Sequence, residues 1–167
     1  MIKFALDKGI ISINQLGFTA GNRCSDAHII INTLVNKTCH KNGSKIFSCF
    51  VDFKKAFDSV PRDTLLKKLH SFGITGKFFN VIRNIYTTDK AGIKQNNFKS
   101  SLFDLNIGVR QGCIMSPILF NIFLCDLAKS LHEMGGGLSL DKDPINSIFW
   151  ADDLVMFAIS EKKLQEM

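Results

Sequence analysis

The chain has 167 residues, of which 46% are hydrophobic, and this is enough for one compact domain or for one domain and part of another. Its formal net charge is +6, and residues 37–110 hold fourteen basic against five acidic side chains, while the remainder is net acidic. The longest apolar stretch, Ile114–Leu124, contains polar residues and is shorter than a membrane span, so we expect no membrane partner. A polyanion is an expected partner of the basic segment, and an ordinary solvated surface is the alternative.

Cysteine usage and the N-terminal residues bear on the cellular compartment. The five cysteines are odd in number and form no CxxC pair, which predicts reduced thiols and no zinc site. The stretch Met1–Asn14 is interrupted by charged residues and lacks the apolar core of a signal peptide. We therefore expect an intracellular protein.

The first third of the chain predicts one helix and one strand. Residues 1–22 are expected to be loop-like, and Ser25 is expected to cap a helix over 26–40. Residues 46–53 are a dense β-type run that is apolar on both faces, which favours a central strand. This strand carries a carboxylate, Asp52, near its end, where a buried charge needs a partner.

The middle of the chain predicts scaffold helices and a hairpin. Helical spacing of apolar residues predicts helices over 61–72 and 77–87. Two strands, over 91–95 and 98–107, are expected to be joined by a turn at Asn96 and Asn97.

A glycine-framed loop and a long helix follow. Gly108 and Gly112 frame the loop, and Ser116 and Pro117 are expected to start the helix as its cap and first-turn residue. Glycines at 135–137 are expected to end it.

Two adjacent carboxylates lie in the next hairpin. Apolar runs over 147–150 and 154–160 predict strands, which places Asp152 and Asp153 at the tip between them. Two like charges beside apolar strands are costly to ionise together unless a cation lies between them, although Asp is also a common turn residue. If the strand that ends at Asp52 is a neighbour in the same sheet, the three carboxylates can share two Mg²⁺ ions.

The order of elements predicts an α+β fold. Alternating strands and helices, without an internal repeat, fit an antiparallel sheet with helices on one face, the ferredoxin-like (RRM-like) arrangement.

Four segments read INQLGFTAGNRCSDA, FVDFKKAFDSV, GVRQGCIMSPILFNIF and FWADDLVMF, and together they span residues 13–157. In sequence and in order they resemble the palm of reverse transcriptases, most closely those of non-LTR retrotransposons. The last three are similar to the family's motifs A, B and C. The resemblance implies a partial fingers segment at 1–44 and a truncated palm at 45–167, with the thumb absent.

The resemblance also implies an activity, RNA-directed DNA polymerisation by two-metal nucleotidyl transfer of a dNTP onto a DNA primer along an RNA template. The ions would be Mg²⁺, with Mn²⁺ as an alternative, and the family suggests a nuclear location. The implied catalytic and metal-binding residues are Asp52, Asp152 and Asp153, with the Phe53 carbonyl as a further ligand. Those implied to bind the nucleotide are Lys55, Ala56, Phe57 and Gln111, and those implied to contact template or primer are Arg110, Gly112, Ser116 and Trp150.

Some features depart from the family or leave alternatives open. Trp150 stands where motif C usually has Tyr or Phe, and Thr19 stands where a basic residue is common. Phe57 could equally be core, and Ser116 with Pro117 could serve helix capping alone. A noncatalytic nucleic-acid-binding remnant of a decayed element, a nucleotide cyclase and an enzyme of the group II intron type are the other readings.

Overall fold

The computed structural model describes residues 1–41, 44–140 and 144–167. The chain divides into two compact units, and we describe each by itself. The first unit comprises residues 1–54 and 124–167, and the second comprises residues 55–123. These boundaries differ from the expected division between fingers and palm after residue 44, and that division stays a prediction.

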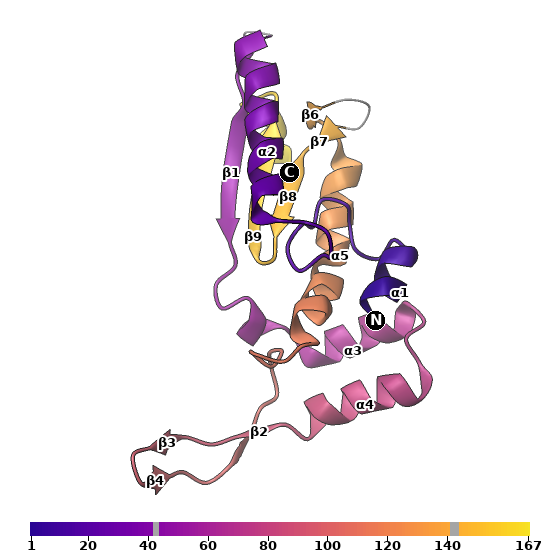
Figure 1. Ribbon diagram of the computed structural model, residues 1–167, viewed down its shortest axis with the longest axis vertical. Helices are drawn as coiled ribbons and strands as arrows, with labels where there is room; N and C mark the ends of the chain where they lie inside the picture. Colours follow the sequence, from indigo (N-terminus) through magenta and orange to yellow (C-terminus); the bar gives the residue numbers. More distant parts are fainter. Residues whose placement is uncertain (42–43, 141–143) are drawn as a thin grey trace. The chain divides into compact units, whose positions relative to one another are not determined.

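The first unit is built on a three-stranded antiparallel sheet (Figure 1). Its strands are β1 (Phe47–Asp52), β8 (Ser147–Trp150) and β9 (Asp153–Ala158), in the order β1-β9-β8. The α+β class and the acid-bearing hairpin expected from the sequence are confirmed. The central position expected for β1 is wrong, because β1 is an edge strand whose residues alternate between half-buried and exposed. Its apolar run included Phe50, which is exposed.

The first unit holds α1 (Ile2–Asp7), α2 (Cys24–Val35) with a π-helical continuation at Asn36–Lys41, and α6 (Glu161–Glu166). Two of the helices in the first unit, α2 and α6, contact this sheet. A core cluster of Leu16, Leu34, Leu138, Ile148, Val155 and Phe157 joins the sheet to α2, whose Ala27 and Ile31 pack against it. Burying each such side chain contributes roughly 1.5–3 kcal/mol relative to exposure. Two short strands, β6 (Leu138–Ser139) and β7 (Pro144–Ile145), form an antiparallel pair. Leu138 of β6 belongs to this cluster, and Ile145 of β7 packs against it.

Two expectations for the N-terminal region are wrong. Residues 2–7 are helical rather than loop-like, because Ala5 is buried and Gly9 ends the turn with a positive φ of 61°. The cap of α2 is Arg23 rather than Ser25, since the Arg23 backbone N–H donates to the Asp26 carboxylate at 2.6 Å. Both errors concern helix starts, which depend on local capping contacts.

The second unit holds the two scaffold helices, confirmed as α3 (Arg62–Ser71) and α4 (Gly76–Thr87), which contact each other. A 3₁₀ turn, Phe57–Ser59, precedes α3. The long helix α5 (Ser116–Met134) begins in this unit and ends in the first. The expected hairpin between α4 and the glycine loop forms four short strands: β2 (Lys90–Ala91), β3 (Lys94–Gln95), β4 (Phe98–Lys99) and β5 (Phe103–Asp104).

No helix among the described residues is both long enough and apolar enough to span a membrane. The five cysteines are free thiols.

Candidate active site

The pairing of β1 with β9 brings the distant carboxylates together. Its register places Asp52 directly opposite Asp153, the first residue of β9, while Asp152 occupies the turn just before it. Side chains of directly opposed residues point to the same face, with Cβ atoms about 4.5–5.5 Å apart. The sequence-based expectation that Asp52 lies beside the doublet is therefore met, although the roles of the three acids stay predictions.

The carboxylates suit a divalent cation. Like charges directly opposite each other are destabilising in a sheet. Within the described residues, no hydrogen bond or ion pair engages the side chains of Asp52, Asp152 or Asp153. The three are not preassembled as a three-ligand group in the described part of the chain. Mg²⁺ commonly takes only one or two protein carboxylates and completes its shell with water and substrate phosphates, so the pair fits such an ion.

The turn that carries Asp152 is held by a buried amide from the N-terminal region. Gln15, which is 4% exposed, donates from Nε2 to the Ala151 carbonyl at 3.1 Å, and its Oε1 accepts from the Ala151 N–H at 3.1 Å. The same oxygen accepts from the Gly17 N–H at 2.9 Å. Ala151 has a φ of 59°, a left-handed conformation that is unfavourable for a residue with a side chain. The Gln15 amide thus stabilises a strained residue next to Asp152.

The segment around Gln15 also pairs with β8. Phe149 N–H donates to the Asn14 carbonyl at 2.8 Å, and Leu16 N–H donates to the Phe149 carbonyl at 2.9 Å. Gly17 lies so close that a Cβ placed there would be 2.1 Å from the Ala151 nitrogen. Only glycine allows this approach of two backbones.

A pocket of about 330 Å³ adjoins the acids on the face of the sheet that α2 covers. Asp52 and Asp153 lie at its edge, Trp150 and Phe50 line it from the strands, and Ala27 and Ile31 line it from α2. Trp150 is paired with Asp153 across the hairpin, so its indole lies on the same face as both opposed acids. The pocket combines a polar rim with an apolar wall.

In the second unit, the residues just after β1 form a tight turn. Lys55 has a φ of 51°, and Ala56 follows in a right-handed helical conformation, so consecutive N–H groups converge as in an anion-binding nest. The Phe57 ring stacks on Phe120 of α5, with centroids 4.6 Å apart and ring planes inclined by 13°. Phe57 is half-buried, so it serves the core while one part of the ring stays accessible.

The glycine-framed loop is tied to this turn. Gly108 N–H donates to the Val60 carbonyl and Val109 N–H to that of Phe57. Gln111 Nε2 donates to Asp58 Oδ1 at 2.8 Å, which gives Asp58 a contact that the sequence did not suggest. The loop containing Gln111 and Gly112 is thus held beside the turn containing Ala56 and Phe57.

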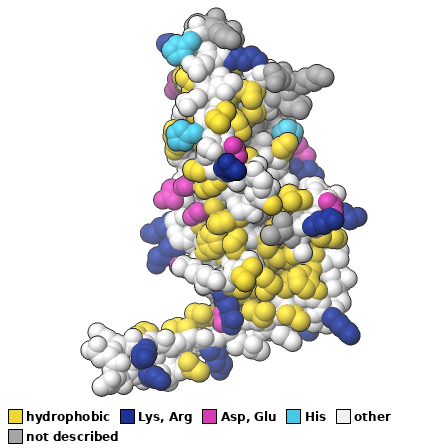
Figure 2. Space-filling model, viewed as in Figure 1, with side chains coloured by type: hydrophobic (Ala, Val, Ile, Leu, Met, Phe, Trp, Pro, Cys, Tyr) yellow, Lys and Arg dark blue, Asp and Glu magenta, His cyan; other side chains and the backbone are white. Residues whose placement is uncertain are grey.

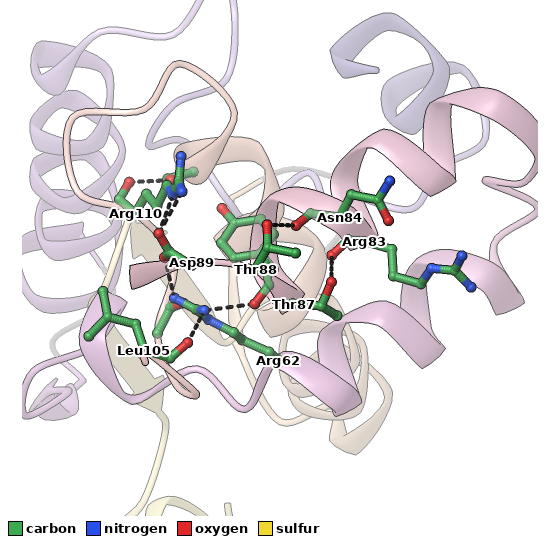
Figure 3. Close-up of polar contacts among 11 residues, drawn as sticks. Arg62, Arg83, Asn84, Thr87, Thr88, Asp89, Leu105 and Arg110 are labelled. Carbon is green, nitrogen blue, oxygen red and sulfur yellow. Dashed lines mark hydrogen bonds and ion pairs between the residues drawn. The ribbon is translucent and has the colours of Figure 1, made fainter. Parts of the chain in front are cut away.

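Arg110 is anchored by a buried carboxylate (Figure 3). Its Nε and one terminal nitrogen both donate to Asp89 Oδ1, at 3.0 and 2.5 Å, while Arg62 donates to Asp89 Oδ2 at 2.8 Å. The hydrogen bond from Arg110 lowers the pKa of Asp89, burial opposes this, and Arg62 lowers it further. The same hydrogen bond raises the pKa of Arg110. The Arg110 side chain remains 45% exposed, so its outer face is accessible to a ligand.

Arg62 links several separate segments of the second unit. Its guanidinium, in a residue 6% exposed, also donates to the carbonyls of Gly108 and Tyr86, each at 2.8 Å, and to that of Leu105. Ser116 Oγ donates to the Arg110 carbonyl instead of accepting as a helix cap, which corrects its expected capping role. The start of α5 is therefore also fixed to this loop.

Sequence reasoning brought out neither Gln15 nor Asp89. Gln15 lies in the quoted segment INQLGF, and its signal was a polar amide within an apolar, glycine-containing run. Asp89 lies between Thr88 and Lys90, where an acid reads as an ordinary surface residue. Both residues bind partners that are distant in sequence, so no local pattern indicates their role.

Comparisons with known proteins agree with this geometry. A family model described as "Reverse transcriptase (RNA-dependent DNA polymerase)" matches residues 2–167. The Pol polyprotein of the type-2 retrotransposable element R2DM of Drosophila melanogaster is 30% identical over 151 residues, which are 90% of this chain and 14% of that protein. The RNA-directed DNA polymerase from mobile element jockey of Drosophila funebris is 32% identical over 113 residues, or 68% of this chain and 12% of that protein.

A solved structure shares the fold. Apo telomerase from Candida tropicalis, truncated from its C-terminal domain, superposes with a TM-score of 0.70 at 15% identity, covering 98% of this chain and 34% of that one. The chain spans about one seventh of the length of the first curated relatives that it matches.

Proposed function

The chain belongs to the reverse transcriptase family, of the non-LTR retrotransposon type, and on this premise we propose that it supplies the polymerase palm of an RNA-directed DNA polymerase. In this reaction the 3′-hydroxyl oxygen of a DNA primer bonds to the α-phosphorus of a dNTP on an RNA template. The bond from that phosphorus to the bridging oxygen breaks, and pyrophosphate leaves. The observation that carries the proposal is the register that sets Asp52 opposite Asp153, beside Asp152.

The three acids would hold two Mg²⁺ ions, or Mn²⁺ in their place, with the Phe53 carbonyl as a further ligand. When bound, such ions activate the attacking hydroxyl and neutralise charge on the leaving group. The contribution of the chain is to place the carboxylates: the β1–β9 ladder fixes Asp52 and Asp153, and the Gln15 amide fixes the turn of Asp152.

The turn after β1 would meet the nucleotide. The Lys55 and Ala56 N–H groups are in a turn suited to phosphate oxygens, and the accessible part of Phe57 would contact the incoming sugar. Gln111 would lie along the nucleotide, and Arg110, Gly112, Ser116 and Trp150 would contact the template or primer. The rigid tie of Arg110 to Asp89 supports a positioning role for this loop.

Primer extension on an RNA template with Mg²⁺ tests this proposal, in the protein that carries the chain. Asp52→Asn and Asp152→Asn are expected to lose on the order of 100-fold or more in rate, because each removes a metal ligand. Glu133→Gln, an exposed carboxylate on α5, is the matched control and should extend normally. Extension by Asp152→Asn at the rate of the control would refute the assigned role.

A noncatalytic nucleic-acid-binding remnant is the second candidate, and the basic segment at 37–110 favours it. It predicts salt-dependent binding of oligonucleotides without Mg²⁺-dependent binding of dNTP. A calorimetric titration with dNTP and Mg²⁺ separates the two, because only the polymerase should bind the nucleotide in a way that Asp52→Asn weakens.

A further inference from the structure

The second unit carries a two-stranded arm, residues 90–104, between α4 and the glycine-framed loop. Near its base β2 pairs with β5, and near its tip β3 pairs with β4, around a two-residue turn at Asn96 and Asn97 (Figure 1). Asn96 has a positive φ of 51°, as such tight hairpin turns require. The arm extends away from α4, so both of its faces are largely exposed.

Two lysines stand directly opposite each other near the tip. The register pairs Lys94 with Lys99, and both are exposed. Like charges in this position are destabilising, because their side chains lie on one face within about 5 Å at Cβ. Among the described residues, no carboxylate pairs with either of them; the acid of the arm, Asp104, is 3.4 Å from Lys90 at the base. The pair is therefore a concentrated, uncompensated positive site.

The other face of the tip is apolar. Gln95 pairs with Phe98, which is 68% exposed, and Ile93 is also exposed. Because neighbouring residues of a strand point to opposite faces, the lysine pair and Phe98 lie on different sides of the ribbon. Figure 2 shows blue lysine atoms and yellow apolar atoms along this projecting segment.

From the lysine pair we infer that the arm is a docking surface for the phosphate backbone of a polynucleotide strand, held between Lys94 and Lys99. This inference rests on the proposed function for the class of partner, and it adds a contact surface outside the motif-bearing residues. A phosphate between the two ammonium groups removes their mutual repulsion and forms charge-assisted hydrogen bonds with both. A protein partner is less well matched, because lysine is depleted from the cores of protein–protein interfaces.

An edge-strand function offers a competing explanation for the lysines. Exposed strands often carry lysine to prevent pairing with other chains. Under that explanation, replacing the lysines lowers solubility and leaves binding of nucleic acid unchanged. The two explanations therefore differ in a measurable quantity, the number of phosphate contacts.

The experiment is a fluorescence-anisotropy titration of a labelled 20-nucleotide single strand, in EDTA and without dNTP, at several KCl concentrations. For Lys94→Gln with Lys99→Gln, we expect the slope of log K against log salt to become less steep by about 1.4, since each lost phosphate contact contributes about 0.7 for a single strand. Affinity at low salt should fall roughly tenfold. The matched control, Lys67→Gln with Lys77→Gln on α3 and α4, removes the same charge from exposed helix sites of the same unit.

Three outcomes decide the inference. A change in slope in the arm variant that exceeds that of the helix control supports it, and equal changes in both overturn it in favour of a general charge effect. Unchanged binding with reduced solubility overturns it in favour of edge protection. The assay contains EDTA and no dNTP, so it does not depend on bound metal ions or on nucleotide transfer, and failure of the catalytic proposal is read separately from failure of the arm.

Phe98→Ser provides the check on an apolar partner. Because Phe98 faces away from the lysine pair, this variant should keep the salt slope of the unchanged protein. If Phe98→Ser abolishes binding while the lysine variant does not alter it, an apolar contact governs the arm and the phosphate-docking inference is overturned.

Discussion

The turn that carries Asp152 and the loop that carries Arg110 are both held by buried polar side chains, but by different physics. In the turn, the neutral amide of Gln15 bonds to backbone atoms of Ala151 and Gly17. In the loop, an ionised carboxylate, Asp89, binds two guanidinium groups. We call the Gln15 contacts the neutral tether and the Asp89 contacts the ionic tether. The neutral tether adds no charge beside the acids that would hold cations. The ionic tether is stronger per contact, but it depends on pH, and loss of one charged partner leaves another buried charge unpaired.

The largest effect should come from breaking the ionic tether. Asp89→Asn leaves Arg62 buried without its anionic partner, and this is expected to cost about 3 kcal/mol in the free energy of unfolding. Chemical denaturation monitored by fluorescence measures it. Asp104→Asn, which breaks an exposed pair with Lys90, should cost less than about 1 kcal/mol. Equal losses of stability in the two variants would show that the ion pairs of Asp89 stabilise the protein no more than an exposed ion pair does.

The neutral tether should break with a smaller cost in stability and a specific cost in metal binding. Gln15→Met keeps the side-chain volume but removes three hydrogen bonds, which should cost about 2–3 kcal/mol. Because the turn of Asp152 loses its anchor, the affinity for Mg²⁺ measured by calorimetry should also fall.

Thr19→Val is the matched control for this change. Thr19 donates to the carbonyls of Gln15 and Gly17 and does not bond to the Ala151 turn. It should lower the melting temperature without lowering the affinity for Mg²⁺. If both variants lose Mg²⁺ affinity in proportion to their loss of stability, Gln15 has only a general structural role.

The smallest effect, and the one that most directly contrasts the two tethers, is in the response to acid. The pKa of Asp89 is lowered in the folded state, mainly by the Arg110 hydrogen bond, so its stabilisation is present above the unfolded pKa of about 4 and is lost as pH falls through the folded pKa. The acid loss of stability should therefore be shallower in Asp89→Asn than in the unchanged protein. Gln15→Met should retain the full acid dependence. Unfolding curves at several pH values below 5 measure the difference. The same decrease in the free energy of unfolding with falling pH in all three proteins would contradict it.

Local patterns predicted the elements that carry the acids. The strand ending at Asp52 and the hairpin at Asp152 could be predicted because both lie in dense β-type runs, and a pair of adjacent acids interrupts the second run. Their adjacency was the condition on which the metal-site hypothesis rested, and the β1–β9 register meets it. The turn at Asn96 and Asn97 was readable from its residue types.

Contacts between distant parts of the chain were not readable. Gln15 and Ala151 are 136 residues apart, and Asp89 lies 27 and 21 residues from its two arginines. Neither pairing produces a periodic pattern in the sequence, because each depends on how the helices and strands pack against one another after they have formed. The edge position of β1 was missed for a related reason: composition reports apolar character, whereas Phe50 is exposed by the topology of the sheet.

The order of the strands also has a consequence for handling the protein. Residues 14–16 bond along the outer side of β8, but among the described residues nothing pairs with the outer side of β1. Free backbone groups next to the exposed Phe50 ring make this border a template for strand addition between copies. Solubility at high concentration should thus be limited at this strand, and a charged substitution at Phe50 is the natural remedy.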